Sequence, residues 1–590
     1  MNIAITGYGI LSAIGCDRQS VLQSLRDKCT GIAPARFLRT IHSELPVGEV
    51  KHSDTEMKRM LSIPSDEDIS RTTLMGILAV RQALLHARLS NSGAPAPKRV
   101  ALVLGTTVGG MDVTEKHFSK ISGTGGTRYF RDHDCGSCTT AVSRYFGDFF
   151  SDTFTVSTAC SSAANAISLG ARLIKDGQAD IVVAGGSEAL SLFHLNGFNS
   201  LMILDHETCR PFDATRTGLN LGEGAAFVVL EEEKSTEKRN CPVQAYLTGY
   251  GNACDAYHQT ASSPEGEGAF LAMEEALRTA GLTPSDISYI NAHGTGTPNN
   301  DLCESAALKR VFGATIPPVS STKGFTGHAT SAAGGIESVI CLLAMQEGFI
   351  PTSAGFATPD ADCITPSKGV DSIPLRHVMC NSFGFGGNDS SLIFSISPTS
   401  GQEDSKAIYS EEEIHEAARV VVSTDEEMKD ISRFVKSIES RRMGRLMKSS
   451  LLASLQVLEK GGVEKPDAII TATAYGCTVN SEKILHQILS EGESAISPTL
   501  FMLSTHNTIG SNIAIRTHCH GYNTTYTQGE RSLECALRDA RMLLRSGQAK
   551  SVLVGCHDEL TPLLRELLGA DAPFKTDFRS TAILLTLCGK

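Results

Sequence analysis

A cysteine at the junction of a strand and a helix is the first residue in this sequence whose position suggests chemistry. Cys160 lies in TVSTACSSAANAI, residues 155–167, between a strand-like run and a run of small, helix-forming residues. The N-terminus of a helix carries a partial positive charge, which favours the thiolate form of a cysteine placed there. The segment therefore predicts an activated nucleophile, although an inert buried thiol explains this segment alone equally well.

Two histidines occupy similar junctions further along the chain. His293 ends a strand-like run in NAHGTGTPNND, residues 291–301, and His328 precedes a small-residue helix in KGFTGHATSAAGG, residues 323–335. Lys323 opens the second of these segments. A single histidine is more often structural than catalytic. Two histidines, each flanked by glycine at a strand-to-helix turn, favour a catalytic site that also contains Cys160.

A glycine-rich segment completes the set of candidates. NSFGFGGND, residues 381–389, ends a strand-like run and carries Phe383 and Phe385 among its glycines. Glycine allows the backbone to approach a ligand closely. We expect this loop to line a ligand pocket and to act as a movable gate.

Short apolar runs that alternate with helical patterns must position these residues. This alternation is typical of layered α/β architecture. The runs are almost continuously apolar, so we expect most of the strands to be buried on both faces. Examples are VALVLGTT (100–107), DIVVAGGSEAL (180–190), GAAFVVLEEE (224–233), ISYINAHG (287–294) and HVMCNSFGFGG (377–387).

Length and composition set the outer limits. The chain has 590 residues, of which 41% are hydrophobic and 20% charged, as in ordinary globular proteins. With 53 Lys plus Arg against 65 Asp plus Glu, the formal net charge is −12, which disfavours general binding to nucleic acid or to anionic membranes. No apolar run reaches ~18 residues, so we expect no membrane span.

The start of the sequence lacks a signal-peptide pattern, and 17 cysteines without a framework spacing favour a cytoplasmic protein with reduced thiols.

The chain contains a partial internal repeat. Residues 160–190 and 530–560 align without gaps, and each reads as an amphipathic helix, a Gly-Gln-Ala turn and a buried strand. Residues 398–408, rich in Ser, Gly and charge, predict a linker that separates a main body from a tail, residues 409–590. The tail repeats only the first part of the main body. Three further pairs of segments recur in the same order, namely 71–84 with 441–455, 99–110 with 467–477, and 224–232 with 580–588.

Taken in order, STACSS, HGTGTPNND, KGFTGH and NSFGFGG resemble the four motifs of the beta-ketoacyl-acyl-carrier-protein synthases of the elongating type. The resemblance covers residues 1–397. It implies the thiolase fold, in which two similar halves, residues 1–240 and 241–397, form a five-layered α-β-α-β-α structure, with the tail as a third, partial α/β half-domain. It also implies decarboxylative Claisen condensation of a cysteine-bound acyl chain with malonyl-acyl carrier protein, in fatty acid, aryl-polyene or polyketide biosynthesis.

The resemblance assigns a role to each candidate residue. Cys160 would hold the acyl group as a thioester, and His293 and His328 would stabilise the enolate formed when malonyl loses carbon dioxide. A thioester intermediate divides the reaction into two easier steps, and imidazole donors stabilise charge on a thioester oxygen. Lys323 would support the histidines electrostatically, and Glu337 would form a structural contact beneath the site.

Phe385 takes a double role by the same resemblance. Its backbone N–H and that of Cys160 would form the oxyanion hole, and its side chain would be the gate. The family often has Gly-Gly-Thr-Asn after this phenylalanine, whereas residues 386–389 of this chain are Gly-Gly-Asn-Asp. We therefore expect gating, or contacts with phosphopantetheine, to differ at this loop.

Related activities fit the motifs less well. A thiolase that does not decarboxylate usually pairs its nucleophile with a second cysteine and one histidine, and an initiating-type synthase has asparagine at the position of His328. A non-catalytic chain-length factor lacks the cysteine found here at Cys160. The remaining alternative is a chain-length-factor-like assembly protein whose chemistry is vestigial.

The tail cannot repeat this chemistry. Glu530 takes the position of Cys160 in the repeat, and the tail contains no counterpart of His293 or His328. The tail resembles N-terminal half-domains found beside ketoacyl synthases in aryl-polyene and flexirubin-type pathways, which suggests a structural or chain-length role. Half a thiolase fold leaves one face of its sheet uncovered, so we expect that face to pack against another half.

A metal site in the tail is conceivable but disfavoured. His506, His518, Cys519 and His520 lie close together in residues 506–522. Their spacing matches no common zinc-finger pattern, and adjacent side chains on a strand point to opposite faces. We therefore expect no metal.

The partner that the resemblance implies is acyl carrier protein, which is acidic and helical. Phosphopantetheine is carried by that partner, so no cofactor is expected on this chain. Since the net charge is −12, docking requires a local basic patch, for which Arg172, Arg210 and Arg216 are candidates; internal ion pairs explain these arginines equally well. A homodimer, or a heterodimer with another ketosynthase-like subunit, is also implied, with no nucleic acid. The acyl chain length and the pathway do not follow from the sequence.

Overall fold

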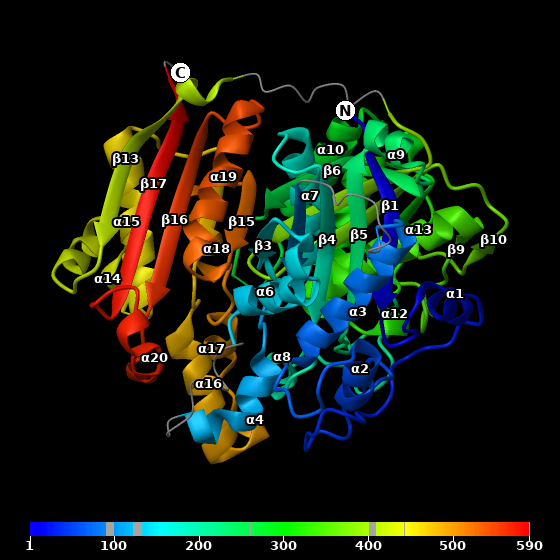
Figure 1. The fold of residues 1–590 in the computed structure, drawn as a ribbon, viewed down its shortest axis with the longest axis horizontal. Helices are drawn as coiled ribbons and strands as arrows, with labels where there is room; N and C mark the ends of the chain where they lie inside the picture. Colours follow the sequence, from blue (N-terminus) through cyan, green and yellow to red (C-terminus); the bar gives the residue numbers. More distant parts are fainter. Residues whose placement is uncertain (90–98, 122–132, 260, 400–408, 442, 589–590) are drawn as a thin grey trace.

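The computed structural model describes residues 1–89, 99–121, 133–259, 261–399, 409–441 and 443–588. One sheet of 15 strands runs through these residues, and its strand order divides it into three groups of five (Figure 1). The first group belongs to a unit formed by the first 240 residues, the second to a unit that extends to the high 390s, and the third to the tail. The predicted linker, residues 398–408, lies outside the described residues apart from its first two positions.

The first unit is a sheet covered by helices on both faces. In the order β3-β2-β4-β5-β1, the three strands β2, β3 and β4 are parallel and β5 is antiparallel to its neighbours. One face carries α3 and α6, and the other carries α7. The bounds are β1 (Ile3–Leu11), β2 (Val100–Gly105), β3 (Asp152–Val156), β4 (Ile181–Glu188), β5 (Gly224–Glu232), α3 (Arg71–His86), α6 (Cys135–Tyr145) and α7 (Ser162–Lys175).

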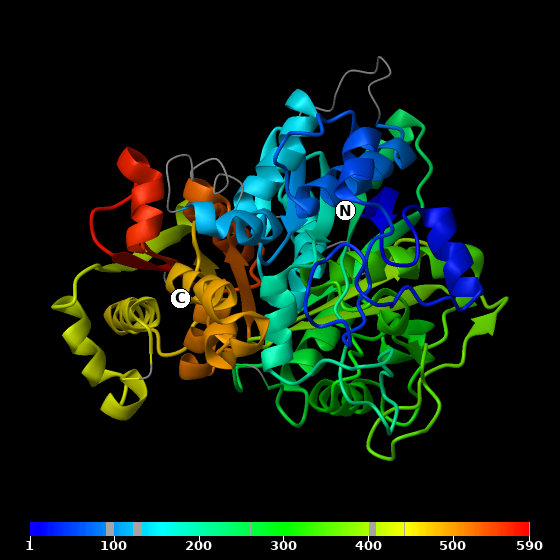
Figure 2. The same cartoon turned by 90° about the horizontal axis from the view of Figure 1, so that it is seen from below.

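The second unit stacks on the first through a shared layer of helices. Its strands continue from β1 in the order β6-β12-β11-β7-β8. Helix α13 lies beside α7, between the strands of the first unit and those of the second unit. Helix α10, with α11 beside it, covers the opposite face of the second unit's strands. Figure 2 shows the second unit (green) beneath the first (blue to cyan), which gives the predicted α-β-α-β-α layering and confirms the fold class. The bounds are β6 (Ala245–Cys254), α10 (Glu267–Ala280), β7 (Tyr289–Asn291), α11 (Pro298–Phe312), β8 (Val319–Ser320), α13 (Ala333–Glu347), β11 (His377–Gly384) and β12 (Asn388–Ser395).

The tail repeats the first unit strand for strand. Its order, β13-β17-β16-β14-β15, matches β1-β5-β4-β2-β3 of the first unit. Helices α15 and α19 take the places of α3 and α7, and α18 that of α6. The repeat in the sequence is therefore a repeat of structure. The bounds are β13 (Ile414–Val422), α15 (Arg445–Gly461), β14 (Ala468–Ala472), α18 (Thr508–Thr517), β15 (Tyr522–Tyr526), α19 (Ser532–Arg545), β16 (Ser551–Glu559) and β17 (Phe578–Leu587).

The tail joins the first unit edge to edge. Strands β15 and β3 are antiparallel, with Tyr526 opposite Val156, and the Ser157 N–H donates to the Thr525 carbonyl at 2.9 Å. Because β15 and β3 are counterparts in the repeat, the strands of the tail and those of the first unit are related by a pseudo-twofold axis (Figure 1). The tail thus packs in cis. A second copy of the chain could pair with β3 only by displacing the tail.

The tail does not bury a bare sheet face against another half, and that expectation was wrong. Helices α15 and α18 cover one face of its sheet, and α19 covers the other. A single amphipathic helix is sufficient for this. Glu534 and Arg541 are exposed on α19 at the positions that Ala164 and Ala171 occupy in the fully enclosed α7.

Shorter elements surround these layers. Helices α4, α8, α16 and α17 contact one another where the tail abuts the first unit, at the lower side of Figure 1. Among the helices that the structure describes, none has the length and apolar character needed to cross a bilayer. The bounds are α1 (Arg18–Arg26), α2 (Asp54–Leu61), α4 (Met111–Ile121), α8 (Leu192–Ser200), α9 (Glu233–Arg239), α12 (Lys323–Thr326), β9 (Phe349–Ile350), β10 (Val370–Asp371), α14 (Ser437–Ser440), α16 (Thr478–Glu491), α17 (Pro498–Met502) and α20 (Pro562–Leu568).

Candidate functional site

Cys160 lies on a tight turn between β3 and α7. Ala159, the residue before it, has a φ of +52°, a left-handed conformation that is strained for alanine. Ser162 fixes the turn, because its hydroxyl donates to the Ala159 carbonyl at 2.7 Å and accepts from the Thr158 N–H at 2.9 Å. The turn places the buried Cys160 side chain at the N-terminal end of α7.

His328 faces this thiol from the second unit. Its Nε2 atom lies 3.0 Å from Cys160 Sγ. The backbone of His328 is anchored on both sides, since its N–H donates to the Asn220 carbonyl at 2.7 Å and its carbonyl accepts from the Gly222 N–H at 2.9 Å. One imidazole nitrogen is thereby held where it can exchange a proton with the thiol.

His293 follows β7 and lies beside His328, with the two ring centroids 5.3 Å apart. Its loop is held by Glu304 of α11, whose carboxylate accepts from the N–H groups of His293 at 2.9 Å and Gly294 at 2.7 Å. His293, His328 and Cys160 line one cavity of about 460 Å³. The three candidate residues from distant parts of the sequence therefore share one space.

Lys323 is buried behind the histidines. Its ammonium donates to the His293 carbonyl at 2.5 Å and lies 3.4 Å from His293 Nδ1. It also forms a buried ion pair with Glu337 of α13. Since an unpaired buried ammonium would be very costly, Glu337 is the counter-ion that keeps Lys323 in place.

Both histidines are neutral at physiological pH. Burial, together with the positive charge of Lys323, holds the pKa of His293 and the pKa of His328 well below the usual range. A neutral imidazole has one nitrogen that accepts a proton and one N–H that donates. Each ring is therefore equipped either to deprotonate a thiol or to donate to a developing oxyanion.

Burial raises the pKa of the Cys160 thiol to about 12, although the charge of Lys323 and the backbone N–H of Phe385 act in the opposite direction. The sequence predicted that the helix macrodipole would itself favour the thiolate, and this was wrong. At this buried position the free-energy cost of desolvating a charged sulfur is larger than the stabilisation that the helix dipole gives the thiolate. The thiol is protonated at neutral pH, and the neutral His328 lies within hydrogen-bond distance of it, where it is placed to accept the proton.

Phe385 approaches Cys160 from the turn between β11 and β12. Its backbone N–H lies near enough to the Cys160 sulfur to lower the pKa of that thiol, and the backbone N–H of Cys160 acts in the same direction. The structure thus brings the two N–H groups that the resemblance assigns to an oxyanion hole to the same side of the site as the thiol. The Phe385 ring stacks on Phe198 of α8 with the centroids 5.6 Å apart. Gly386 and Gly387 follow with φ of +83° and +73°, values that glycine adopts without strain.

A route from the surface reaches the same residues. The 460 Å³ cavity is bounded on one side by the loop 383–387 and on another by Thr295 and Thr297. Met202 lies at its rim and is 88% exposed. Cys160 is therefore buried but accessible through this opening.

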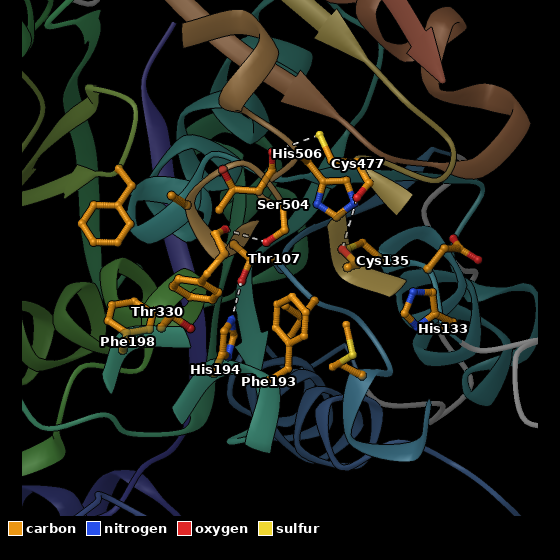
Figure 3. Close-up of a pocket in the computed structure, with 18 of the residues that line it drawn as sticks. Thr107, His133, Cys135, Phe193, His194, Phe198, Thr330, Cys477, Ser504 and His506 are labelled. Atoms are coloured by element: carbon orange, nitrogen blue, oxygen red, sulfur yellow. Dashed lines mark hydrogen bonds between the residues drawn. The ribbon is translucent and has the colours of Figure 1, made fainter. Parts of the chain in front are cut away.

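A second, narrower cavity of about 60 Å³ extends from Cys160 into the contact between the tail and the first unit. Met111 of α4 and Phe193 of α8 contribute apolar side chains to it. Figure 3 shows Cys477, Ser504 and His506 of the tail around this space, facing Thr107 and Phe193. The sequence did not predict that the tail supplies a wall of this cavity. Its principal lining residues from the tail are Tyr475, Cys477, Phe501, Ser504, Thr505 and His506.

Phe501 contributes an aromatic ring to the tail side of this cavity. Its ring packs on Phe198 and Phe193, with centroid distances of 5.4 Å and 5.9 Å. It also lies directly against Gly197 of α8, where a Cβ atom would overlap the ring. The absence of a side chain at Gly197 is what lets the tail insert this aromatic ring.

Glu188, which the sequence did not single out, holds the loops around the thiol. Its carboxylate accepts from the Thr107 N–H at 2.7 Å and from the Ser331 hydroxyl at 2.5 Å. Asp558 does the same in the tail, where it accepts from the Ala474 N–H at 2.8 Å. An acidic residue at the end of the strand in both copies of the repeat was the signal that could have indicated this role.

The tail keeps the turn of the first unit without its thiol. Gly529, the counterpart of Ala159, has a φ of +56°. Ser532 repeats the bonds of Ser162, donating to the Gly529 carbonyl at 2.6 Å and accepting from the Gln528 N–H at 2.8 Å. Glu530 stands where Cys160 would be, and it is exposed. This turn carries no nucleophile.

The metal-ligand candidates of the tail do not converge. His506 lines the narrow cavity, His518 is exposed after α18, Cys519 is buried, and His520 contacts the Cys254 carbonyl at 3.1 Å. Across the described ranges no group of three His, Cys, Asp or Glu side chains is placed to hold a metal ion.

The three arginines suggested for a basic docking patch are all neutralised within the chain, so that suggestion was wrong. Arg172 and Arg216 are buried, and Arg210 is mostly buried. Their ion pairs are Arg172–Asp539 at 2.8 Å, Arg216–Asp360 at 2.6 Å and Arg210–Glu207 at 2.7 Å.

Three segments of the chain match sequence models of one protein family. Residues 1–236 match "Beta-ketoacyl synthase, N-terminal domain", and residues 244–357 match "Beta-ketoacyl synthase, C-terminal domain". Residues 415–572, within the tail, match a second model of the N-terminal domain.

Individual proteins agree with this assignment. Nodulation protein E of Rhizobium meliloti (strain 1021) is 36% identical over 406 residues, which cover 66% of this chain and 98% of that protein. The 3-oxoacyl-[acyl-carrier-protein] synthase 2 of Staphylococcus aureus (strain MRSA252) is 34% identical over 410 residues, 67% of this chain and 98% of that protein. Among solved structures, the PfaC Keto synthase-Chain length factor covers all of this chain and 78% of its own with a TM-score of 0.82; at 16% identity the likeness is one of fold alone.

Proposed function

Because the chain belongs to the beta-ketoacyl synthase family, we propose that Cys160, His293 and His328 condense an acyl chain with a malonyl unit, both delivered by acyl carrier protein. The chain is a condensing enzyme of the transferase class. The observation that carries the residue assignment is the 3.0 Å separation of Cys160 Sγ and His328 Nε2, with the His293 ring beside them.

The first step is acyl transfer to Cys160. Nε2 of His328 accepts the thiol proton while the sulfur attacks the carbonyl carbon of the acyl thioester. The N–H groups of Cys160 and Phe385 donate to the resulting oxyanion. Collapse of this adduct breaks the bond to the sulfur of the carrier, which leaves with the proton held by His328. The acyl group then remains on Cys160, and His328 is neutral again.

The second step is decarboxylation and condensation. Loss of carbon dioxide from the malonyl thioester leaves the electron pair of the broken carbon–carbon bond in an enolate. For this step the single proton of His328 is carried on Nε2, the opposite tautomer to the one that accepts the thiol proton, and the enolate oxygen accepts hydrogen bonds from the N–H groups of His293 and His328. The enolate carbon attacks the Cys160 thioester, and the thiolate of Cys160 is expelled and takes a proton from water. Lys323 contributes by keeping both imidazoles uncharged.

To the tail we assign closure of the acyl cavity in cis, a role like that of a chain-length factor. Its support is that Phe501 and His506 line the narrow cavity that begins at Cys160. An acyl chain that grows on Cys160 would extend toward these side chains. The alternative, an assembly protein with vestigial chemistry, is less well supported, because the thiol and both neutral histidines are present.

The wider cavity suits the delivery of substrates. It offers the phosphopantetheine arm of a carrier protein a path between Thr295, Thr297 and the loop 383–387 to Cys160. The arm belongs to the carrier, so the proposed reaction needs no cofactor resident on this chain. We place the enzyme in the cytoplasm because its 17 cysteines follow no disulfide-framework spacing in the sequence.

Substitution of the two histidines separates the two steps. His293→Ala retains acylation of Cys160, because the base His328 is intact, but slows malonyl decarboxylation by about 10²–10³-fold, the usual cost of one oxyanion donor. His328→Ala loses both steps. Acylation is followed by intact-protein mass spectrometry and decarboxylation by release of labelled carbon dioxide. A His293→Ala enzyme that condenses at the wild-type rate would overturn the assignment.

A further inference from the structure

The loop that carries Phe385 is tied to the tail by one buried amide. Asn507, the residue before α18, donates from Nδ2 to the Phe385 carbonyl at 2.8 Å and to Oδ1 of Asn388 at 2.6 Å. Asn507 is only 1% exposed, so water does not compete for these bonds. A single side chain of the tail therefore holds both ends of the Phe385–Asn388 turn.

The middle of the same turn also contacts the tail. Gly386 lies so close to Ser511 of α18 that a Cβ atom would collide with the Ser511 hydroxyl. The Gly386 N–H donates to the Gln259 carbonyl at 3.0 Å, and the side chain of Gln259 donates to Asn512 Oδ1 of α18 at 2.7 Å. The turn cannot move toward the tail unless α18 moves as well.

The ring of Phe385 is linked to the tail through one intermediate ring. It stacks on Phe198, and Phe198 packs against Phe501 of the tail. The tail thus restrains the backbone of Phe385 directly and its ring indirectly.

The side chain of Asn507 is committed to this loop and not to its own helix. Asparagine at a helix N-cap normally accepts from the N–H groups of the first turn. Asn507 occupies the N-cap of α18 without making such a bond. In the counterpart helix α6, the N-cap residue Asp134 does make such a bond, accepting from the Ser137 N–H at 2.9 Å. The N-cap side chain of α18 is therefore used to hold the Phe385 loop, whereas the N-cap side chain of α6 caps its own helix.

We propose that Asn507 is a positioning residue, which fixes the backbone of Phe385 so that its N–H points at the reacting carbonyl and which makes acyl transfer to Cys160 depend on the docked tail. The inference rests on the proposed function, because it assigns to the tail control of the oxyanion hole in that same reaction. For the Phe385 loop to open as a gate, the two Asn507 bonds must break or α18 must move with the loop. The docked tail therefore holds the Phe385 loop in place and restricts its opening.

The test compares two reactions of the same sulfur. Acyl transfer from an acyl-acyl carrier protein to Cys160 needs the oxyanion hole, whereas alkylation of Cys160 by iodoacetamide forms no oxyanion. Both rates are measured on the full chain by digestion and mass spectrometry of the peptide that contains Cys160, because exposed cysteines such as Cys29 are alkylated as well. The variants are Asn507→Ala and Asn507→Asp. The control is Asn480→Ala, which removes a bond of equal length, from Asn480 Nδ2 to the Leu503 carbonyl at 2.8 Å, elsewhere in the tail.

Asn507→Ala removes two hydrogen bonds, of which only the one to the Phe385 carbonyl holds the oxyanion-hole residue itself. We therefore expect acyl transfer to fall about two- to tenfold, the worth of one neutral hydrogen bond, while alkylation is unchanged or faster. Asn507→Asp should be slower still, since its carboxylate faces two acceptor oxygens. Asn480→Ala should match the wild type. Equal acyl transfer in Asn507→Ala and wild type would overturn the positioning role and leave the proposed function standing. If the rates of acyl transfer and alkylation fall in parallel and the unfolding temperature is lower, Asn507 is only a structural contact, and the positioning role is overturned as well. Failure of the wild type to acylate Cys160 would instead overturn the proposed function.

Discussion

Arg172 of α7 and Asp539 of α19 form an ion pair 2.8 Å long across the contact between the first unit and the tail. Both side chains are buried, and Asp539 also accepts from the hydroxyls of Tyr522 and Tyr526 at 2.8 Å each. Because α7 and α19 are counterparts in the repeat, a cation on one central helix meets an anion on the other. This ion pair favours packing of the tail on the first unit over packing of two tails on each other.

Breaking this pair on one side should destabilise the protein strongly. Arg172→Met introduces the residue that the repeat has at position 542 and leaves Asp539 as an uncompensated buried charge. We expect the free energy of unfolding, measured by circular dichroism in urea, to fall by about 3–5 kcal/mol. Adding Asp539→Leu, after Leu169 of α7, should restore a large part of the loss. A double variant no more stable than Arg172→Met would contradict this account of the contact.

Enlarging the acyl cavity from the tail side should lengthen the product. Phe501→Leu removes ring atoms that contact Phe198 and Phe193, so a growing acyl chain gains room for at least one further extension. Product lengths are read by liquid chromatography and mass spectrometry. Phe434→Leu, at a half-buried tail phenylalanine that packs in a different cluster, serves as the control. Unchanged product length in Phe501→Leu would show that the tail does not limit the chain.

A buried histidine of the tail should make the fold sensitive to acid. Burial lowers the pKa of His557 to about 3, whereas a histidine in the unfolded chain titrates near 6.5. Below about pH 6.5 the unfolded state therefore binds a proton at this histidine that the folded state does not bind. The contribution of neutral His557 to the free energy of unfolding is complete above that pH, and it is lost as the pH falls toward about 3.

Replacing this histidine removes that loss. His557→Ser introduces the residue found at Ser187 in the first unit. Relative to the wild type, the free energy of unfolding of the variant should improve by about 1.4 kcal/mol for each pH unit between pH 6 and 4. Urea unfolding at several pH values measures this, and His518→Ser, at an exposed position, is the control. Parallel pH profiles of His557→Ser and wild type would refute the prediction.

Removal of the tail should expose an unpaired strand edge. Without residues 398–590, the edge of β3 that pairs with β15 is open and the narrow cavity loses its tail wall. We expect the shortened chain to aggregate, or to pair through β3 with a second copy, and to lose control of product length. Size-exclusion chromatography with light scattering tests the first point. A monodisperse monomer with an unchanged product profile would be incompatible with the role assigned to the tail.

The sequence predicted well what depends on local pattern. The thiol at a strand-to-helix turn and the glycine-flanked histidines are local features, and the internal repeat indicated the third half. The five layers were implied by the family resemblance that these motifs carry. The motifs also selected Cys160, His293 and His328, which the structure brings into one cavity.

What the sequence could not supply depends on packing between distant segments. Glu304 and Glu188 are ordinary acidic residues until the fold brings them to the N–H groups of the catalytic loops. Phe501 reaches the acyl cavity only because the sheets join at β3 and β15. The pKa of Cys160 was misjudged for the same reason, since burial, which no local motif reveals, outweighs the helix dipole.

Acylation of Cys160 itself tests the central claim most directly. The full chain is incubated with an acyl-acyl carrier protein, digested and analysed by mass spectrometry at the peptide that contains Cys160. We predict that the acyl mass appears on Cys160, that it is removed when malonyl-acyl carrier protein is added, and that Cys160→Ala forms no condensation product. An unmodified Cys160, together with a Cys160→Ala chain that still elongates, would contradict the account.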